Sequence, residues 1–272
     1  SQLYQTDGTN NVSLGYKALR NADNGESGNV VIGSEAGMNI NHASSDGNVI
    51  IGGTAGTGGA SAMTGVVAIG QNAMNSTDSN AQTGTVAIGK DALTALTDGD
   101  KNVALGYLAG SQITTGDSNI ALGHQAMDEI STGDRNIAIG HNAIGNAQGG
   151  ATSGDSKDNI AIGFQSQGGA WADAECLKNT SIGSYSLDGA LNGALQNTAL
   201  GYASLGAVTQ GDNNVAVGME AGDNITTGTK NVTIGQQART SAVGATNQIV
   251  IGATATGIAD NSVTLGNSSV TK

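Results

Sequence analysis

The stretch "NVALGYLAGSQITTGDSNIALGHQAMDEISTGDRNIAIG", residues 102–140, decides the fold of this protein. It contains the block Asn-(Val/Ile)-Ala-(Leu/Ile)-Gly three times, at intervals of 17 residues. A block that returns at a fixed interval is typical of repeat architectures, in which each copy forms one structural unit and neighbouring units stack. The stretch therefore predicts a solenoid.

The block recurs along the whole chain of 272 residues, in fifteen copies. Most copies lie 17 to 19 residues apart, and the extremes are 14 and 23. Their closing glycines are Gly15, Gly33, Gly52, Gly70, Gly89, Gly106, Gly123, Gly140, Gly163, Gly183, Gly201, Gly218, Gly235, Gly252 and Gly266. This coverage predicts one continuous repeat domain over residues 11–270 after a lead-in at 1–10, with no separate globular domain.

Each position of the block accepts only a few residue types. Val, Ile or Thr stands three residues before the glycine, Leu, Ile or Val one residue before it, and Ala or Ser three residues after it. Asn stands four residues before the glycine in eleven of the fifteen copies. In the three copies of the quoted stretch and the turn that follows it, the repeat residues are Asn102, Val103, Leu105, Gly106, Ala109, Asn119, Ile120, Leu122, Gly123, Ala126, Asn136, Ile137, Ile139, Gly140 and Ala143.

The alternation of β-branched and small residues predicts a short strand in every copy. We expect about 15 coils of an all-β, parallel solenoid, with strands stacked about 4.8 Å apart. Because neither strand face is polar, we expect the large aliphatic side chains to fill the coil and sister chains to cover the alanine-lined face. The recurrent asparagines are expected to form a hydrogen-bonded ladder.

The composition excludes several kinds of partner. The chain has 44 Gly, no Pro, 10 Lys and Arg, and a formal net charge of −12. So few cations make binding to nucleic acid unfavourable, and no apolar run in this segment is long enough to insert into a membrane. The expected partner is the chain itself, because the second apolar face needs cover.

The copies "NVALG…A", "NIAIG…A" and "NTALG…S" resemble the repeat of the head domain of trimeric autotransporter adhesins and of related shafts in bacteriophage tail fibres. The resemblance covers essentially residues 11–270, and it implies a left-handed parallel β-roll that assembles as a homotrimeric fibre. The repeats of the compact adhesin heads are shorter. The longer "TTGDSNIALGHQA" style is more similar to the tail-fibre type.

The resemblance implies a structural and adhesive fibre segment, extracellular, in a phage tail fibre or related virion appendage. Such a segment mediates attachment to a host cell surface, through a glycan or a protein receptor. One alternative is a bacterial surface adhesin of the trimeric autotransporter type, and another is a glycan-hydrolysing tail spike. A membrane-anchor barrel or a tail-attachment domain in the flanking sequence would separate the first two.

We expect no catalysis, no metal and no cofactor. His124 and His141 each follow a block glycine, but without acidic or Cys partners at that position they favour a packed column over a metal site. The Gly-Asp pairs lack the nonapeptide spacing of calcium-binding coils and are better explained as turns.

One long loop is a candidate receptor contact. The stretch between Gly163 and Gly183 holds the only Trp and the only Cys of the chain. Loops on a rigid scaffold often carry recognition, so Trp171, Asp173 and Glu175 form a possible receptor-contact loop. The alternative is that Trp171 folds back to cover a local apolar patch.

Overall fold

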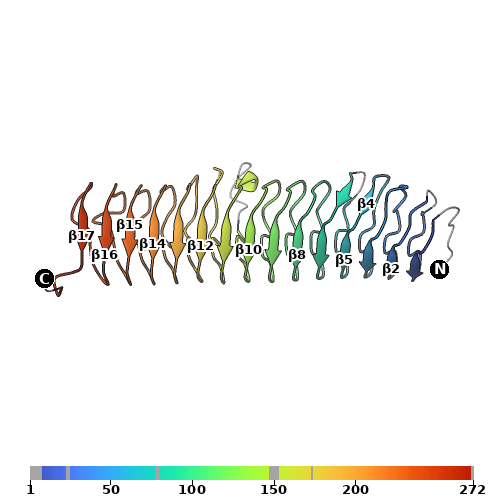
Figure 1. Cartoon of the computed structure of the whole chain (residues 1–272), viewed down its shortest axis with the longest axis horizontal. Helices are drawn as coiled ribbons and strands as arrows, with labels where there is room; N and C mark the ends of the chain where they lie inside the picture. Colours follow the sequence, from blue (N-terminus) through green and yellow to red (C-terminus); the bar gives the residue numbers. More distant parts are fainter. Residues whose placement is uncertain (1–7, 23–24, 78–79, 147–152, 173, 271–272) are drawn as a thin grey trace. The chain divides into compact units, whose positions relative to one another are not determined.

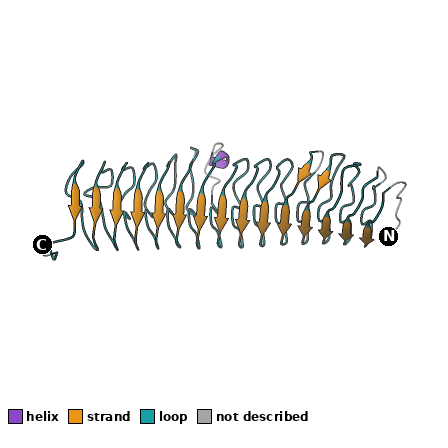
Figure 2. Ribbon diagram, viewed as in Figure 1, coloured by secondary structure: helices purple, strands orange, loops and turns teal. Residues whose placement is uncertain are grey.

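The protein is an all-β, parallel β-solenoid (Figure 1; Figure 2). A computed structural model describes residues 8–22, 25–77, 80–146, 153–172 and 174–270. The chain divides into two compact units, residues 1–135 and 136–272, and each unit is a stack of coils. The solenoid predicted from the repeated block is confirmed.

Each of the fifteen blocks forms one strand of three residues. The first unit contains β1 (Val12–Leu14), β2 (Val30–Ile32), β3 (Val49–Ile51), β5 (Val67–Ile69), β7 (Val86–Ile88), β8 (Val103–Leu105) and β9 (Ile120–Leu122). The second unit contains β10 (Ile137–Ile139), β11 (Ile160–Ile162), β12 (Thr180–Ile182), β13 (Thr198–Leu200), β14 (Val215–Val217), β15 (Val232–Ile234), β16 (Ile249–Ile251) and β17 (Val263–Leu265). Two shorter strands, β4 (Met63–Thr64) and β6 (Gln82–Thr83), pair with each other, and η1 (Ser153–Asp155) is a single 3-10 turn.

Within each unit the strands pair in parallel and in register. Ala104 of β8 lies opposite Ala121 of β9, and Ala199 of β13 lies opposite Ala216 of β14. The hydrogen bonds continue into the following glycine: the amide of Gly106 donates to the carbonyl of Ile88 at 2.8 Å. Because every copy of the block has the same length, identical positions stack on one another and the coils repeat.

The strands point the opposite way from the sequence-based expectation. The central alanines face the coil interior, where Ala121 is 1 % and Ala199 1 % exposed, whereas Leu105 and Leu200 beside such alanines are 48 % and 46 % exposed. The prediction that the large aliphatic side chains fill the coil is therefore wrong, and the alanine face is not the one that sister chains can cover.

The turns explain this orientation. The residues after each block glycine bring large side chains into the interior, as Met127 and Ile130 do, both 0 % exposed. In such coils only a methyl group fits between these side chains and the strand, because protein interiors are close-packed. The larger side chains of the strand must then point outward. Ile50, the central residue of β3, is also 0 % exposed, and the space it fills is left by Gly56 in the following turn.

The bend after each strand requires glycine. Gly106 has a φ of 143°, and a Cβ there would collide with the carbonyl oxygen of Gly123 in the next coil. The segment that returns across the coil is a turn in which Gln125 and Met127 both have a φ of 53° and flank the buried Ala126. Non-glycine residues with positive φ are strained, so packing in the stack must hold this turn in place.

Candidate interaction surfaces

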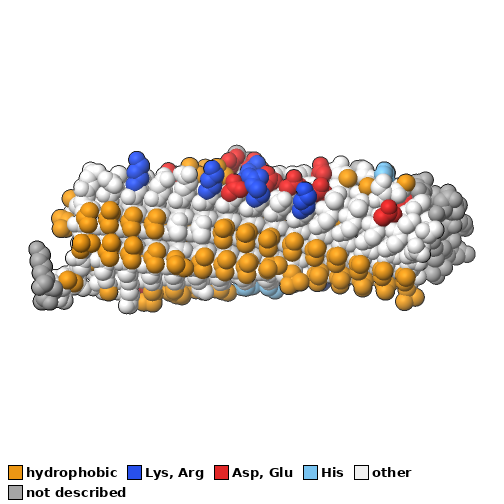
Figure 3. Space-filling view, in the orientation of Figure 1, with side chains coloured by type: hydrophobic (Ala, Val, Ile, Leu, Met, Phe, Trp, Pro, Cys, Tyr) orange, Lys and Arg blue, Asp and Glu red, His pale blue; other side chains and the backbone are white. Residues whose placement is uncertain are grey.

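A stripe of aliphatic side chains lies on the outer face of the strands in each unit (Figure 3). It consists of the first and third residues of the fifteen block strands, and we call it the aliphatic stripe. All thirty positions are Val, Ile or Leu except Thr180 and Thr198. Its most exposed members include Val12, Leu14, Leu105, Ile182, Leu200, Ile234, Ile249, Ile251, Val263 and Leu265.

Thr180 and Thr198 interrupt one row of the stripe in neighbouring coils. They lie opposite each other in the pairing of β12 with β13. The second row continues through Ile182 and Leu200. The two hydroxyl groups are the sole polar side chains within the stripe.

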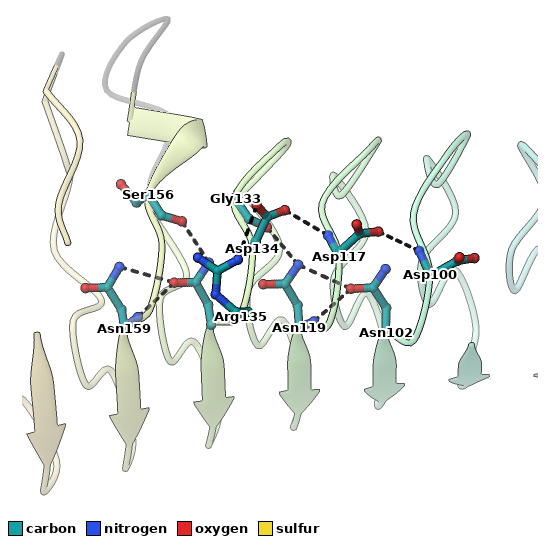
Figure 4. A network of polar contacts seen from close by, with 10 residues as sticks. Asp100, Asn102, Asp117, Asn119, Gly133, Asp134, Arg135, Ser156 and Asn159 are labelled. Carbon is teal, nitrogen blue, oxygen red and sulfur yellow. Dashed lines mark hydrogen bonds and ion pairs between the residues drawn. The ribbon is translucent and has the colours of Figure 1, made fainter. Parts of the chain in front are cut away.

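The asparagines form a ladder at the start of the strands (Figure 4). In the first unit the side-chain amide of Asn119 donates to Oδ1 of Asn102 at 3.2 Å and to the carbonyl of Gly133 at 2.8 Å. The backbone amide of Asn119 also donates to Oδ1 of Asn102, at 2.9 Å. These asparagines are buried, and their hydrogen-bonding groups are used by one another and by the carbonyl groups of the turn. They are therefore not available to a ligand.

Aspartates fasten the turns of neighbouring coils together (Figure 4). In the first unit Asp117 Oδ1 accepts the backbone amide of Asp100 at 2.7 Å, and Asp134 Oδ1 accepts that of Asp117 at 3.0 Å. All three aspartates stand six residues before a block glycine. In the second unit Asp212 holds the same position and accepts the amide of Leu195 at 2.8 Å. The Gly-Asp turns therefore have a structural role.

The position six residues before the block glycine is apolar in two adjacent coils, whereas the other coils have Asp, Thr, Ser or Lys there. Leu177 and Leu195 stand six residues before Gly183 and Gly201, and they form an isolated parallel bridge with each other. Together with Lys178 and Gln196 they line an open dimple of about 170 Å³. We call it the Leu177–Leu195 dimple. It lies in the same coils as the two threonines of the stripe.

Aromatic rings form a column just after the block glycines. In the first unit the rings of Tyr107 and His124 lie 5.2 Å apart. In the second unit His141 stacks on Phe164 at 5.2 Å, and edge contacts continue from Phe164 to Tyr185 at 5.3 Å and from Tyr185 to Tyr202 at 5.7 Å. Tyr107, Phe164 and Tyr202 are 43 %, 40 % and 50 % exposed.

Both histidines that the sequence offered as metal ligands pack against aromatic rings: His124 against Tyr107 in the first unit, and His141 against Phe164 in the second. Among the residues that the structure describes, no group of three His, Cys, Asp or Glu side chains is placed to hold a metal ion.

The candidate receptor-contact loop has its tryptophan inside the fold. Trp171 is 1 % exposed, and its indole N–H donates to the carbonyl of Gln167 at 3.1 Å. The indole ring is therefore not available to stack on a sugar. This agrees with the alternative interpretation, in which Trp171 folds back into the protein. Glu175 is exposed, whereas Asp173 lies outside the described residues.

Three side chains have a raised pKa: Asp128 and Cys176, which are buried, and Asp188, which is partly buried. Burial raises the pKa of Asp128 to about 7, with a further contribution from the charge of Glu129, and burial raises the pKa of Asp188 to about 6. Burial also raises the pKa of the Cys176 thiol to about 11, which keeps it protonated and unreactive. Nothing in this set resembles a nucleophile next to a base.

No helix within the described ranges has the length and apolar character needed to cross a bilayer. No family model matches the chain, and no curated protein matches it either. The functional assignment therefore depends on the repeated block and on the surfaces described above.

Proposed function

We propose that this chain is a self-associating, extracellular fibre segment, assembled as a homotrimer of left-handed coils. In this assembly the aliphatic stripes of three chains face one another around an axis parallel to the stack. The segment holds its outer loops at a cell surface, in the manner of a phage tail fibre or related virion appendage, and performs no catalysis.

The aliphatic stripe is the observation that carries this proposal. The stripe is a row of Val, Ile and Leu side chains, two in almost every coil, none of which is buried. Such a row is more contiguous apolar surface than a soluble monomer leaves uncovered. Burial of such side chains contributes roughly 25 cal/mol per Å² of area removed from water. Identical chains with identical spacing supply a matching surface at every coil, which an unrelated partner would not.

The acidic composition supports a role outside nucleic-acid binding. A net charge of −12 opposes condensation on phosphate backbones and keeps an exposed fibre soluble. The turns opposite the stripe carry most of the variation in repeat length, and loops on a rigid scaffold are the usual carriers of recognition. The receptor contact is thus expected in the turns, for which the exposed Glu175 is one candidate.

Light scattering of the purified chain tests the assembly. We expect three times the mass of one chain at micromolar concentration. The matched variants are Leu200→Glu, on the stripe, and Ala190→Glu, at an exposed turn residue of the same coil that is outside the Leu177–Leu195 dimple. The first variant should be monomeric and the second should retain the mass of the parent chain. A monomeric parent chain would refute the proposal.

Binding to intact cells tests attachment. Fluorescently labelled chain should bind saturably to bacterial cells of a susceptible strain, and unlabelled chain should compete with it. Release of oligosaccharides from surface polysaccharide during the incubation would favour a hydrolytic tail spike over a purely adhesive fibre.

A further inference from the structure

The geometry of a ring of identical chains determines which edges meet. In each coil the strand runs from the aspartate position, six residues before the glycine, to the aromatic column just after it. If chains surround an axis parallel to the stack, every strand runs around that axis in the same sense. The end of a strand in one chain therefore meets the beginning of a strand in the next chain, at the same coil level.

Two coils of the second unit combine an apolar edge at the beginning of the strand with a tyrosine at its end. At the beginning of the strands, the Leu177–Leu195 dimple stands where the other coils have Asp, Thr, Ser or Lys. At the end of the same two strands stand Tyr185 and Tyr202, in contact with each other at 5.7 Å. Each pair spans one coil step, so the two tyrosines have the axial spacing of the two leucines.

We propose that the Leu177–Leu195 dimple receives Tyr185 and Tyr202 of a second copy of this chain at the same coil level. This inference rests on the proposed self-association and identifies a specific docking contact within it. The leucines provide an apolar floor for the rings, and Lys178, which also lines the dimple, supplies a cation that is attracted to an aromatic face.

The threonines of the stripe fit the same contact. Thr180 and Thr198 lie in the strands that connect the dimple to the tyrosines, and their hydroxyl groups can bond to one another or to a tyrosine hydroxyl from the neighbouring chain. If the partner chain were shifted along the stack, the two threonines would face its Val or Ile side chains. Their hydroxyl groups would then have no hydrogen-bond partner in the neighbouring chain. Docking at the same level is thereby favoured over a shift along the stack.

The first unit shows a corresponding complementarity. Asp117 lies just before strand β9, six residues before Gly123, and His124 lies directly after that glycine. The same ring places a carboxylate of one chain beside the imidazole of the next. Thus the edge that receives His124 is acidic, and the edge that receives Tyr185 and Tyr202 is apolar.

Disulfide trapping tests the contact directly. In a chain whose buried thiol is removed by Cys176→Ala, Gln196→Cys is combined with Tyr202→Cys. Within one chain the two positions are about 20 Å apart along the strand, too far for a disulfide. Mild oxidation should therefore join different chains and yield a covalently closed ring on a non-reducing gel. The matched control, Lys230→Cys with Tyr202→Cys, uses the position of Gln196 two coils further along and should not cross-link.

A second variant separates docking from folding. Leu195→Asp installs the residue that Asp212 already provides in the next coil, so the coil should still form. We expect at least a tenfold higher concentration for half-assembly of this variant, and wild-type assembly for Leu195→Met.

The outcomes distinguish the two proposals. A monomeric parent chain refutes the self-association and this contact with it. An oligomer that does not cross-link through 196 and 202, that cross-links equally through 230 and 202, or that tolerates Leu195→Asp refutes this contact alone.

Discussion

Exchange of a neutral side chain for a charged one on the two faces of a single strand tests the orientation of the coil. Ala199→Glu places a carboxylate in the interior, where Ala199 is 1 % exposed and stacks between Ser181 and Ala216. Leu200→Glu places the same group on the stripe, where Leu200 is 46 % exposed.

The expected magnitudes differ widely. A carboxyl in a dry interior raises its pKa by about 3 units or more, which costs about 4 kcal/mol at neutral pH. The larger side chain adds about 1–3 kcal/mol of overpacking. The sum is comparable to the whole free energy of unfolding of a typical domain, about 5–15 kcal/mol. For Leu200→Glu the group remains hydrated, so a single chain should lose about 1 kcal/mol while its assembly is lost.

Circular dichroism melts and light scattering on both variants give the result. We expect Ala199→Glu to lose the cooperative melt, and Leu200→Glu to retain β-structure as a monomer. An Ala199→Glu chain that folds and merely fails to assemble would refute the orientation described here. A Leu200→Glu chain that melts as early as Ala199→Glu would contradict it as well.

Three further predictions concern buried polar groups. The pKa of Asp128 rises from 3.8 to about 7 on folding, so the folded chain binds this proton more tightly, and its contribution to stability declines as pH rises from about 4 to 7, by at most about 4 kcal/mol. Urea denaturation at pH 4 and pH 8 should show a smaller decline for Asp128→Asn, and an unchanged decline would contradict the assignment. Asn214→Ala removes the acceptor of the side-chain amide and backbone amide of Asn231 and should cost about 2–4 kcal/mol, whereas Asn213→Gly at the neighbouring exposed position should change the urea midpoint little; equal effects would argue against the ladder. Cys176, buried with its pKa raised to about 11, should react with a thiol reagent at pH 8 far more slowly in the folded chain than in urea, and rapid native labelling would show that the loop around it opens.

Much of the architecture follows from the residues of the block alone. The fifteen copies share one pattern, in which an apolar, a small and an apolar residue follow one another. Such copies form stacked strands, because each copy can pair with the same block in the next coil. The buried ladder of Asn102 and Asn119 is equally a consequence of sequence, since an amide at the same place in every coil meets its own copy. The glycine after each strand is required because the backbone of the next coil lies too close for a side chain at this position.

The structure alone determines which face of the strand is inside. Alternation shows that two faces differ, but the width of the coil decides which face fits within it, and that width depends on turn residues such as Met127 and Ile130. The Leu177–Leu195 dimple also had to be seen in three dimensions. Its signal in the sequence is a pair of leucines at a position that is polar in every other coil. Only the fold brings these leucines side by side and places Tyr185 and Tyr202 at the other end of the same strands.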